Sequence, residues 1–412
     1  CLASVKDSQT ADALGIRETY QQILDRSSYT LGKVKPDNVQ KLYGKKLRLS
    51  ASQVDKQAEC KMHYFLRYGL RAKERKEATV DPAEFGTYVH AVLEDTAREV
   101  MTRGGFHNVS LEETMNIAKG FSDAYAKERF SQLDSQRVSY LFERNVQELS
   151  AIVEELWQEL SVSQFLPADF ELAFGDGEKM SAICVPDAEM EAQLRGFVDR
   201  VDVWNNGYSN YFRVVDYKTG RKDFDYCDVF NGLGLQMLLY LFALEQEGEE
   251  VFGENLVPAG VQYFAARSPF VTASGKLTDE QAAAEHGKTW KRKGLILADD
   301  AVVNAMEPEG SPKRLSCKVD KNGVLTGDVA QREQLKLLKK YVFKVRRNMV
   351  HNIASGDVTP DPYTRGSAHN ACSFCPYKSV CHFATVEGRR NYKTMSAQRF
   401  WDEISKEVES DG

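Results

Sequence analysis

Residues 196–218 constrain the fold and the chemistry of this chain more than any other stretch. The sequence there is GFVDRVDVW, a polar break and then RVVDYK, which predicts two neighbouring strands. Side chains alternate between the two faces of a strand, so Asp216 and Lys218 share one face while Tyr217 points to the other. Asp199 lies among apolar neighbours, where a carboxylate must be paired or bind a metal. Two carboxylates beside one lysine predict a hard-cation site with a positioned water.

The segments around this stretch predict an α/β fold. Residues 232–248 are apolar almost all round, which is typical of a buried helix, and Gln236 and Tyr240 are its polar positions on one face. Residues 260–266 predict a further strand. The β-β-α-β order indicates a central mixed sheet with helices packed against it. Residues 105–165 are helical by pattern and predict an insertion that covers one side of the core.

Two other predicted helices carry candidate functional side chains. In the helix within residues 81–101, His90 lies beside the apolar stripe and Glu94 follows one turn later. From this helix alone, a histidine bonded to the backbone is the favoured interpretation. The helix over residues 328–354 has a basic face, which is either solvated or a ridge that contacts phosphates.

Composition limits the classes of function. The 412-residue chain has a formal net charge of −6, which argues against a protein whose whole surface grips duplex DNA but not against a local basic track. Its content of 42% hydrophobic and 28% charged residues is ordinary for a soluble globular protein. No apolar run approaches the roughly 20 residues needed to span a membrane. The first residues contain no signal-peptide pattern, so the eight cysteines predict reduced thiols or metal ligands rather than disulfides.

Three of the cysteines, Cys372, Cys375 and Cys381, are closely spaced as C-x2-C-x5-C. Such a set needs a fourth ligand to close a tetrahedral or cubane site. Cys60 is the natural candidate, because it lies in an aromatic and basic segment similar in composition to the segment of the other three. The spacing leaves zinc and a [4Fe–4S] cluster open, and His369 and His382 lie near enough to keep zinc possible. In either case the ligands would staple the two ends of a domain together.

These motifs together resemble a known family. GFVDRVD, DYK and Q-x3-Y, preceded by a helical histidine and flanked by C…C-x2-C-x5-C, resemble the RecB-type, iron–sulfur nuclease domain of the PD-(D/E)XK superfamily. The nearest resemblance is to the C-terminal nuclease domain of the B subunit of bacterial AddAB (RexAB) helicase–nucleases, with LRLSASQVDKQAECKMHYFLRYGLRAKER as its lead-in and CSFCPYKSVC as its end. The resemblance covers residues 45–385. Lys61-Met62 departs from the Pro-Phe that is more usual after the first cysteine.

The resemblance implies roles for individual residues. It implies one or two Mg²⁺ ions held by His90, Asp199, Asp216 and the carbonyl of Tyr217. Lys218 would orient or help to deprotonate the attacking water. Gln236 and Tyr240 would shape the site and contact the DNA strand, the tyrosine by stacking on a base, and Glu94 is a further candidate ligand. A [4Fe–4S] cluster, or less favourably zinc, would be held by Cys60, Cys372, Cys375 and Cys381.

The resemblance also implies a restriction-endonuclease-like core and a function. We expect a lead-in from a preceding domain over residues 1–45, a nuclease domain over 46–390 with the 105–165 insertion, and a helical tail over 391–412, the whole excised from a longer subunit. The implied activity is Mg²⁺-dependent exonuclease cleavage of DNA, on single strands from an unwound end, with an A-type helicase–nuclease subunit as heterodimer partner in double-strand break repair and recombination in the bacterial cytoplasm. The alternatives are a catalytically silent DNA-end-binding scaffold and a zinc-stapled enzyme.

Overall fold

The computed structural model describes most of the chain. The described residues are 8–27, 32–73, 82–130, 136–185, 190–220, 222–267, 278–308, 312–366, 369–381, 383 and 388–410. Within these ranges, no helix is long and apolar enough to cross a membrane.

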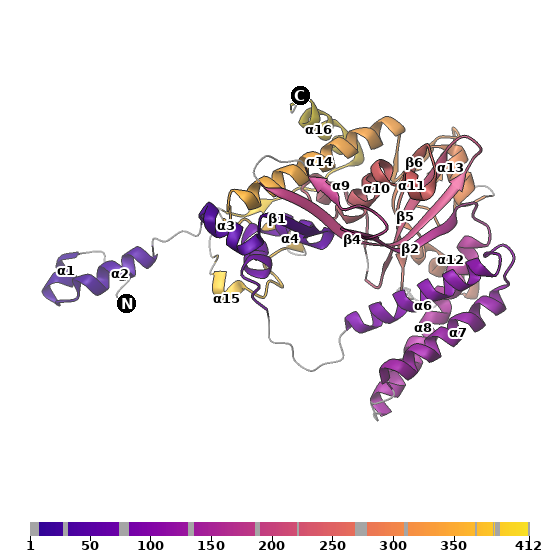
Figure 1. Cartoon of the computed structure of the whole chain (residues 1–412), viewed down its shortest axis with the longest axis horizontal. Coiled ribbons are helices and arrows are strands. Elements are labelled where there is room, and N and C mark those ends of the chain that lie inside the picture. The colour runs from indigo at the N-terminus through magenta and orange to yellow at the C-terminus, as the bar shows by residue number, and fades with distance from the viewer. Residues whose placement is uncertain are drawn as a thin grey trace.

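A mixed eight-stranded sheet lies at the centre of the described structure (Figure 1). Its path runs β1-β4-β5-β6-β7-β10, and β2 and β3 also pair with the long strand β4. The pairs β1–β4, β5–β6 and β7–β10 are parallel, whereas β4–β5 and β6–β7 are antiparallel. The strands are β1 (Lys46–Ser50), β2 (Leu166–Phe174), β3 (Ile183–Val185), β4 (Glu191–Asn205), β5 (Asn210–Lys218), β6 (Leu256–Ala265), β7 (Lys293–Leu297) and β10 (Val329–Ala330).

The predicted β-β-α-β order is confirmed, since β4, β5, α10 (Gln236–Glu247) and β6 follow one another along the chain. Strand β6 begins at Leu256 rather than at residue 260, because its pairing with β5 starts at the Asn210–Leu256 pair. The predicted central mixed sheet with flanking helices is therefore present.

Three helices cover one face of the sheet: α6 (Pro82–Thr102), α7 (Leu111–Phe130) and α8 (Gln136–Leu160). They share a hydrophobic core with side chains of β5 and β6, among them Val92, Leu93, Ile152, Leu156, Val215 and Phe264. The stretch 105–165, where the sequence predicts helices, thus contains α7 and α8, and these pack on the sheet beside α6.

The other face is covered by α4 (Ala51–Glu59), α10, α14 (Arg332–Ala354) and α16 (Ala397–Glu409). Ser50 caps α4 through a reciprocal pair of hydrogen bonds with Gln53. Helix α14 begins four residues later than the predicted boundary at 328, because residues 329–330 form β10 against β7. Part of its basic face is covered by α16, where Lys344 donates to the carbonyl of Glu407 over 2.6 Å.

A buried ionic network joins α8 to the sheet. It contains three arginines of 0–1% exposure and three buried acids: Arg200, Arg213, Arg292, Glu155, Glu159 and Asp202. One carboxylate oxygen of Glu159 lies 2.7 Å from Arg213 and 3.0 Å from Arg200, and the other lies 2.8 Å from Arg292. Each of these buried charges lies within hydrogen-bond distance of an opposite charge, and the partly exposed Arg314 adds a contact of 2.8 Å to Glu155, so the charges are compensated inside the protein.

Shorter elements complete the described structure. Near Cys60 the chain leaves α4 in an extended conformation, with φ at −171°, and then re-enters a helix at Lys61. The helical segments 8–13 and 17–27 are separated at Gly15, which has a φ of 66°. The remaining elements are α1 (Ser8–Ala13), α2 (Arg17–Ser27), α3 (Pro36–Tyr43), α5 (Lys61–Tyr64), a π-helical turn (Phe65–Gly69), α9 (Tyr226–Phe230), α11 (Glu249–Phe252), α12 (Asp279–Thr289), α13 (Asp300–Met306), α15 (Lys378–Cys381), β8 (Cys317–Val319), β9 (Leu325–Gly327), β11 (Tyr363–Arg365), β12 (His369–Asn370) and β13 (Arg390–Asn391).

Candidate metal centre and cysteine cavity

The adjacent strands β4 and β5 bring the two predicted acids and the lysine together. A carboxylate oxygen of Asp199 accepts a hydrogen bond from the backbone N–H of Tyr217 at 2.7 Å. Asp216 and Lys218, which flank Tyr217 in the sequence, lie on the same face of β5 and form an ion pair of 2.5 Å. The Tyr217 ring is buried in the core formed with α6 and α8. The predicted alternation of faces along residues 216–218 is therefore present.

His90 of α6 meets this pair of strands from the side. Its Nε2 lies 2.9 Å from the carbonyl oxygen of Tyr217, and its Nδ1 lies 3.5 Å from the carboxylate of Asp199. The imidazole also packs edge-on against the Tyr217 ring, with centroids 5.5 Å apart. His90 thus makes the backbone contact that the helix pattern alone favours, and it also faces the acid that the sequence assigns to a metal.

Glu171 is a further acid at this site, and the sequence analysis missed it. On β2, Phe170 is opposite Arg200 and Leu172 is opposite Val198, so Glu171 is opposite Asp199 across the antiparallel pair. Its φ of 46° is in the left-handed region, which costs a non-glycine residue about 1–3 kcal/mol and is typical of functional sites. Ligand atoms of His90, Glu171 and Asp199 all lie within 4.8 Å of one another. We call these three residues the metal trio.

Electrostatics support a cation at the metal trio. Burial raises the pKa of Asp199 to about 6, and the neighbouring charge of Asp216 acts in the same direction. Burial raises the pKa of Glu171 to about 7, with the charges of Asp199 and Glu94 acting in the same direction. Like charges that are held together out of water are costly, and a bound cation would relieve that cost.

Asp216 and Glu94 lie beside the metal trio rather than within it. The nearness of Asp216 is seen in its effect on the pKa of Asp199 and in its ion pair with Lys218. Glu94 instead pairs with Arg98 at 2.9 Å, one turn further along α6. Asp216 therefore stays a candidate ligand, whereas Glu94 is engaged elsewhere.

Gln236 and Tyr240 of α10 lie behind the site. The Tyr240 ring is 3% exposed and stacks on Phe174 with centroids 5.7 Å apart, and its hydroxyl is hydrogen-bonded to Gln236. The ring is therefore not available to stack on a base, contrary to the expectation from the sequence. A Cβ added to Gly196 would lie 2.1 Å from the Tyr240 oxygen, so the glycine permits this close approach to β4.

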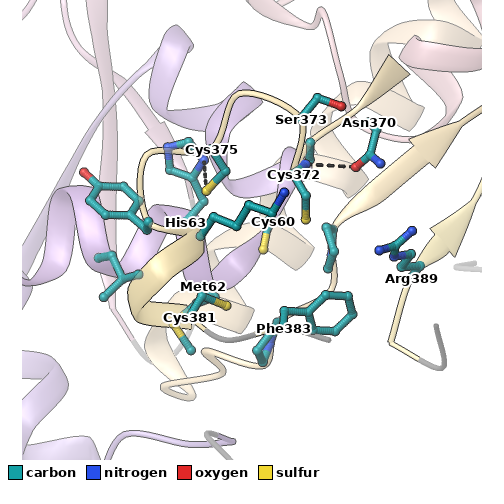
Figure 2. Close-up of a pocket in the computed structure, with 16 residues that line it drawn as sticks. Cys60, Met62, His63, Asn370, Cys372, Ser373, Cys375, Cys381, Phe383 and Arg389 are labelled. Carbon is teal, nitrogen blue, oxygen red and sulfur yellow. Dashed lines mark hydrogen bonds between the residues drawn. The ribbon is translucent and has the colours of Figure 1, made fainter. Parts of the chain in front are cut away.

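The four candidate cysteines line one cavity of about 150 Å³, although Cys60 is far from the others in sequence (Figure 2). Cys60 is at the break between α4 and α5, whereas the other three belong to the segment from β12 to α15. His63, which the sequence analysis did not single out, is 6% exposed and its Nδ1 lies 4.0 Å from the sulfur of Cys375. His382 is outside the described residues, and His369 is on β12.

A larger hollow of about 1180 Å³ lies next to this cavity and shares Tyr377 with it. We call it the tyrosine–arginine groove. Its basic and tyrosine side chains are Lys45, Lys46, Arg48, Arg67, Arg71, Lys73, Tyr43, Tyr64, Tyr68 and Tyr377. The basic side chains match the phosphates of a nucleic-acid strand, and the half-buried Tyr43 and Tyr68 offer partial aromatic surface, whereas Tyr64 and Tyr377 are buried at 3% and 8% exposure.

The comparison with known families decides the classification of the chain. The description of the PD-(D/E)XK nuclease superfamily matches residues 48–382, which include the metal trio and the four cysteines. The chain belongs to the PD-(D/E)XK nuclease superfamily. In this chain, Glu171, Asp199 and Asp216 lie on β2, β4 and β5, and His90 lies on α6.

Curated relatives match nearly the whole chain. The chain is 31% identical over 96% of its length to the B subunit of an ATP-dependent helicase/deoxyribonuclease from Thermoanaerobacter sp. (strain X514), covering 35% of that protein. It is 32% identical over 95% of its length to the protein of the same name in Clostridium novyi, covering 36% of it. The chain thus spans about a third of the length of the curated relatives it matches.

Proposed function

We propose that this chain is a Mg²⁺-dependent exonuclease module that hydrolyses phosphodiester bonds in DNA. The observation that carries the proposal is the meeting of the metal trio, Asp216 and Lys218 at neighbouring strands of a PD-(D/E)XK core. Acids and an amine held together in this way match the needs of metal-assisted hydrolysis.

The residues present fit a hard cation. Carboxylate and carbonyl oxygens are the ligands that Mg²⁺ prefers, and the ion would be held by His90, Glu171, Asp199, Asp216 and the carbonyl of Tyr217. When bound, the ion would lower the pKa of a water and neutralise charge on the phosphate. The ammonium group of Lys218 is fixed by Asp216 at 2.5 Å, so it can orient that water and contact a phosphate oxygen. The N–H of Tyr217 holds the Asp199 carboxylate in place.

The relatives suggest the wider setting. Each is named as the B subunit of an ATP-dependent helicase/deoxyribonuclease, and we propose that this chain is the nuclease part of such a protein. It would act in the bacterial cytoplasm, with an A-type helicase–nuclease partner, on single strands from an unwound DNA end during double-strand break repair and recombination. The tyrosine–arginine groove supports binding to DNA.

We also propose that the cysteine cavity holds a structural [4Fe–4S] cluster rather than zinc. Zinc with Zn–S bonds of about 2.3 Å would bring sulfurs to roughly 3.8 Å from one another. Among the described residues, which include all four cysteines, no three cysteine sulfurs lie within 4.8 Å of one another. The cavity of about 150 Å³ is also far larger than the roughly 15 Å³ that one water-sized particle needs. Both observations favour a group larger than one ion.

Cleavage of a labelled single-stranded DNA with Mg²⁺ tests the nuclease. Asp216→Asn and Lys218→Ala should each lose activity by at least about 100-fold. Asp216→Asn should also weaken Mn²⁺ binding, whereas Lys218→Ala should preserve it, since the lysine is not a ligand. Lys119→Ala, an exposed lysine on α7, is the matched control. Full activity of either site variant would show that the assignment is wrong, and a wild-type chain that binds DNA without cutting it would favour the silent scaffold.

Metal analysis tests the cluster. Anaerobically purified protein should contain about four iron atoms and show broad visible absorption, and Cys375→Ala should lose the iron. Stoichiometric zinc without iron would favour the zinc-stapled alternative.

A further inference from the structure

A second basic hollow, distinct from the tyrosine–arginine groove, opens directly beside Lys218. It has a volume of about 630 Å³ and is bounded by the ends of β5 and β6 and by the connection from α12 to β7. We call it the basic groove. Its cationic side chains are Lys218, Lys222, Arg267, Lys288, Lys291 and Lys293, and Asp223 is the one acid among its described lining residues. This concentration of positive charge occurs in a chain of net charge −6.

The outer wall of the basic groove is the segment 290–293, which is held against the protein by its buried side chains. Along residues 290–293 the side chains alternate, so Trp290 and Arg292 are 4% and 1% exposed while Lys291 and Lys293 are exposed. The Arg292 guanidinium is 2.8 Å from Glu159, donates to the carbonyl of Trp290 at 2.7 Å and covers the Phe264 ring. The two lysines therefore project from a fixed segment rather than from a free loop.

The cations of the wall are only weakly engaged with the protein itself. Lys293 is 3.4 Å from Asp223, and both side chains are more than 40% exposed. Lys291 forms no ion pair with any described residue. Exposed pairs of this kind contribute about 0–1 kcal/mol, so an incoming phosphate can replace them.

We propose that the basic groove binds the sugar–phosphate backbone of the DNA strand whose neighbouring phosphate is cut at the metal trio. The proposal rests on the proposed nuclease function, because Lys218 would touch the scissile phosphate and the groove continues directly from it. Lys291 and Lys293 contact phosphates one or more nucleotides away. The aromatic residues of the groove, Tyr263 and Phe264, are buried at 7% and 0% exposure, so the contacts are to the backbone and do not depend on base sequence.

The salt dependence of DNA binding tests the basic groove. Binding of labelled oligonucleotides to the 412-residue chain is measured by fluorescence anisotropy in chelator, so that no cleavage occurs. For Lys291→Ala/Lys293→Ala, the slope of log K against log [salt] should fall in magnitude by about 1.4 for a single strand or about 1.8 for a duplex. Single-stranded and double-stranded oligonucleotides of the same sequence are compared, which tells whether the groove binds the backbone of a single strand or of a duplex. The loss of two lysine–phosphate contacts to a single strand should weaken binding roughly 25-fold at 0.1 M salt.

The control removes the same charge elsewhere. Lys119→Ala/Lys127→Ala changes two exposed lysines of α7, neither of which lines the basic groove or the tyrosine–arginine groove, and should leave the slope unchanged. An unchanged slope in the groove variant, or an equal fall in both variants, would overturn the proposal. The proposed nuclease function and the proposed basic groove can fail separately. If Asp216→Asn cuts DNA normally, the catalytic assignment is wrong, whatever the salt dependence of binding. If cleavage depends on Asp216 but the groove variant binds like wild type, only the groove fails.

Discussion

Glu159→Gln should destabilise the fold strongly, although the residue is one glutamate among several on α8. The substitution removes the negative charge that Arg200, Arg213 and Arg292 share, with contacts of 2.7–3.0 Å to all three. Breaking a buried pair by removing one partner costs about 3–5 kcal/mol, because it leaves uncompensated charge out of water. This is a roughly 150- to 5,000-fold change in the folding equilibrium and a large part of a typical stability of about 5–15 kcal/mol.

Urea unfolding followed by circular dichroism measures the effect. With a slope of about 3 kcal/mol per M, the midpoint should fall by about 1–2 M. Glu154→Gln is the matched control, since Glu154 is exposed on the same helix and accepts a bond from Gln158, and it should change stability by less than about 0.5 kcal/mol.

The pH dependence gives an independent check. Burial opposes ionisation of Glu159, but the charges of Arg292, Arg213 and Arg200 outweigh it and lower the pKa of the carboxyl in the folded state. Its contribution is therefore present above the unfolded pKa of about 4.3 and is lost as the pH falls through the folded pKa. The difference between wild type and Glu159→Gln should be constant from about pH 5 to 8 and shrink below about pH 4. A midpoint equal to that of Glu154→Gln would refute the reasoning.

Three further predictions concern the metal centre and the cysteine cavity. Gly196→Ala should cost about 1–3 kcal/mol in urea unfolding, since its Cβ would lie 2.1 Å from the Tyr240 oxygen; unchanged stability would show that the tyrosine moves freely. Mn²⁺ affinity, measured by calorimetry, should rise between about pH 5.5 and 7.5 with proton release, because the two acids of the metal trio have pKa values of about 6 and 7; without metal, these raised pKa values make the fold less stable as the pH rises through them. Cys60→Ser should lose iron and lower the melting temperature, whereas the exposed Cys184→Ser should do neither; equal melting curves would argue against a staple.

The part of the site that the sequence predicts is the part set by local alternation. Asp216, Lys218 and Tyr217 are adjacent on one strand, so period-two geometry places them without further information. The shared cavity of Cys60 with the three later cysteines is also predictable, because closely spaced thiols require another ligand.

Glu171 could not be placed by alternation alone. Its position depends on the register of β2 against β4 and on a left-handed backbone conformation, and neither is visible in the letters PADFELAF. An acid in the strand that precedes GFVDRVD is the signal that could have suggested it. The buried charges were missed for a related reason: Glu159 in a charged helix and Arg292 in KRK have the composition of a solvated surface.

The same buried charges connect the catalytic strands to the helical layer and to the basic groove. Arg200 reaches the Tyr217 hydroxyl at 3.3 Å, and the backbone of Tyr217 contacts both Asp199 and His90. Arg292 holds the wall that carries the exposed lysines, and Glu159 binds both arginines. A hydrophobic seam could fix α8 on the sheet equally well, but it has little directional preference, whereas guanidinium–carboxylate pairs have defined geometry. The six buried charges of this network therefore give a defined orientation to the groups that would meet metal and phosphate.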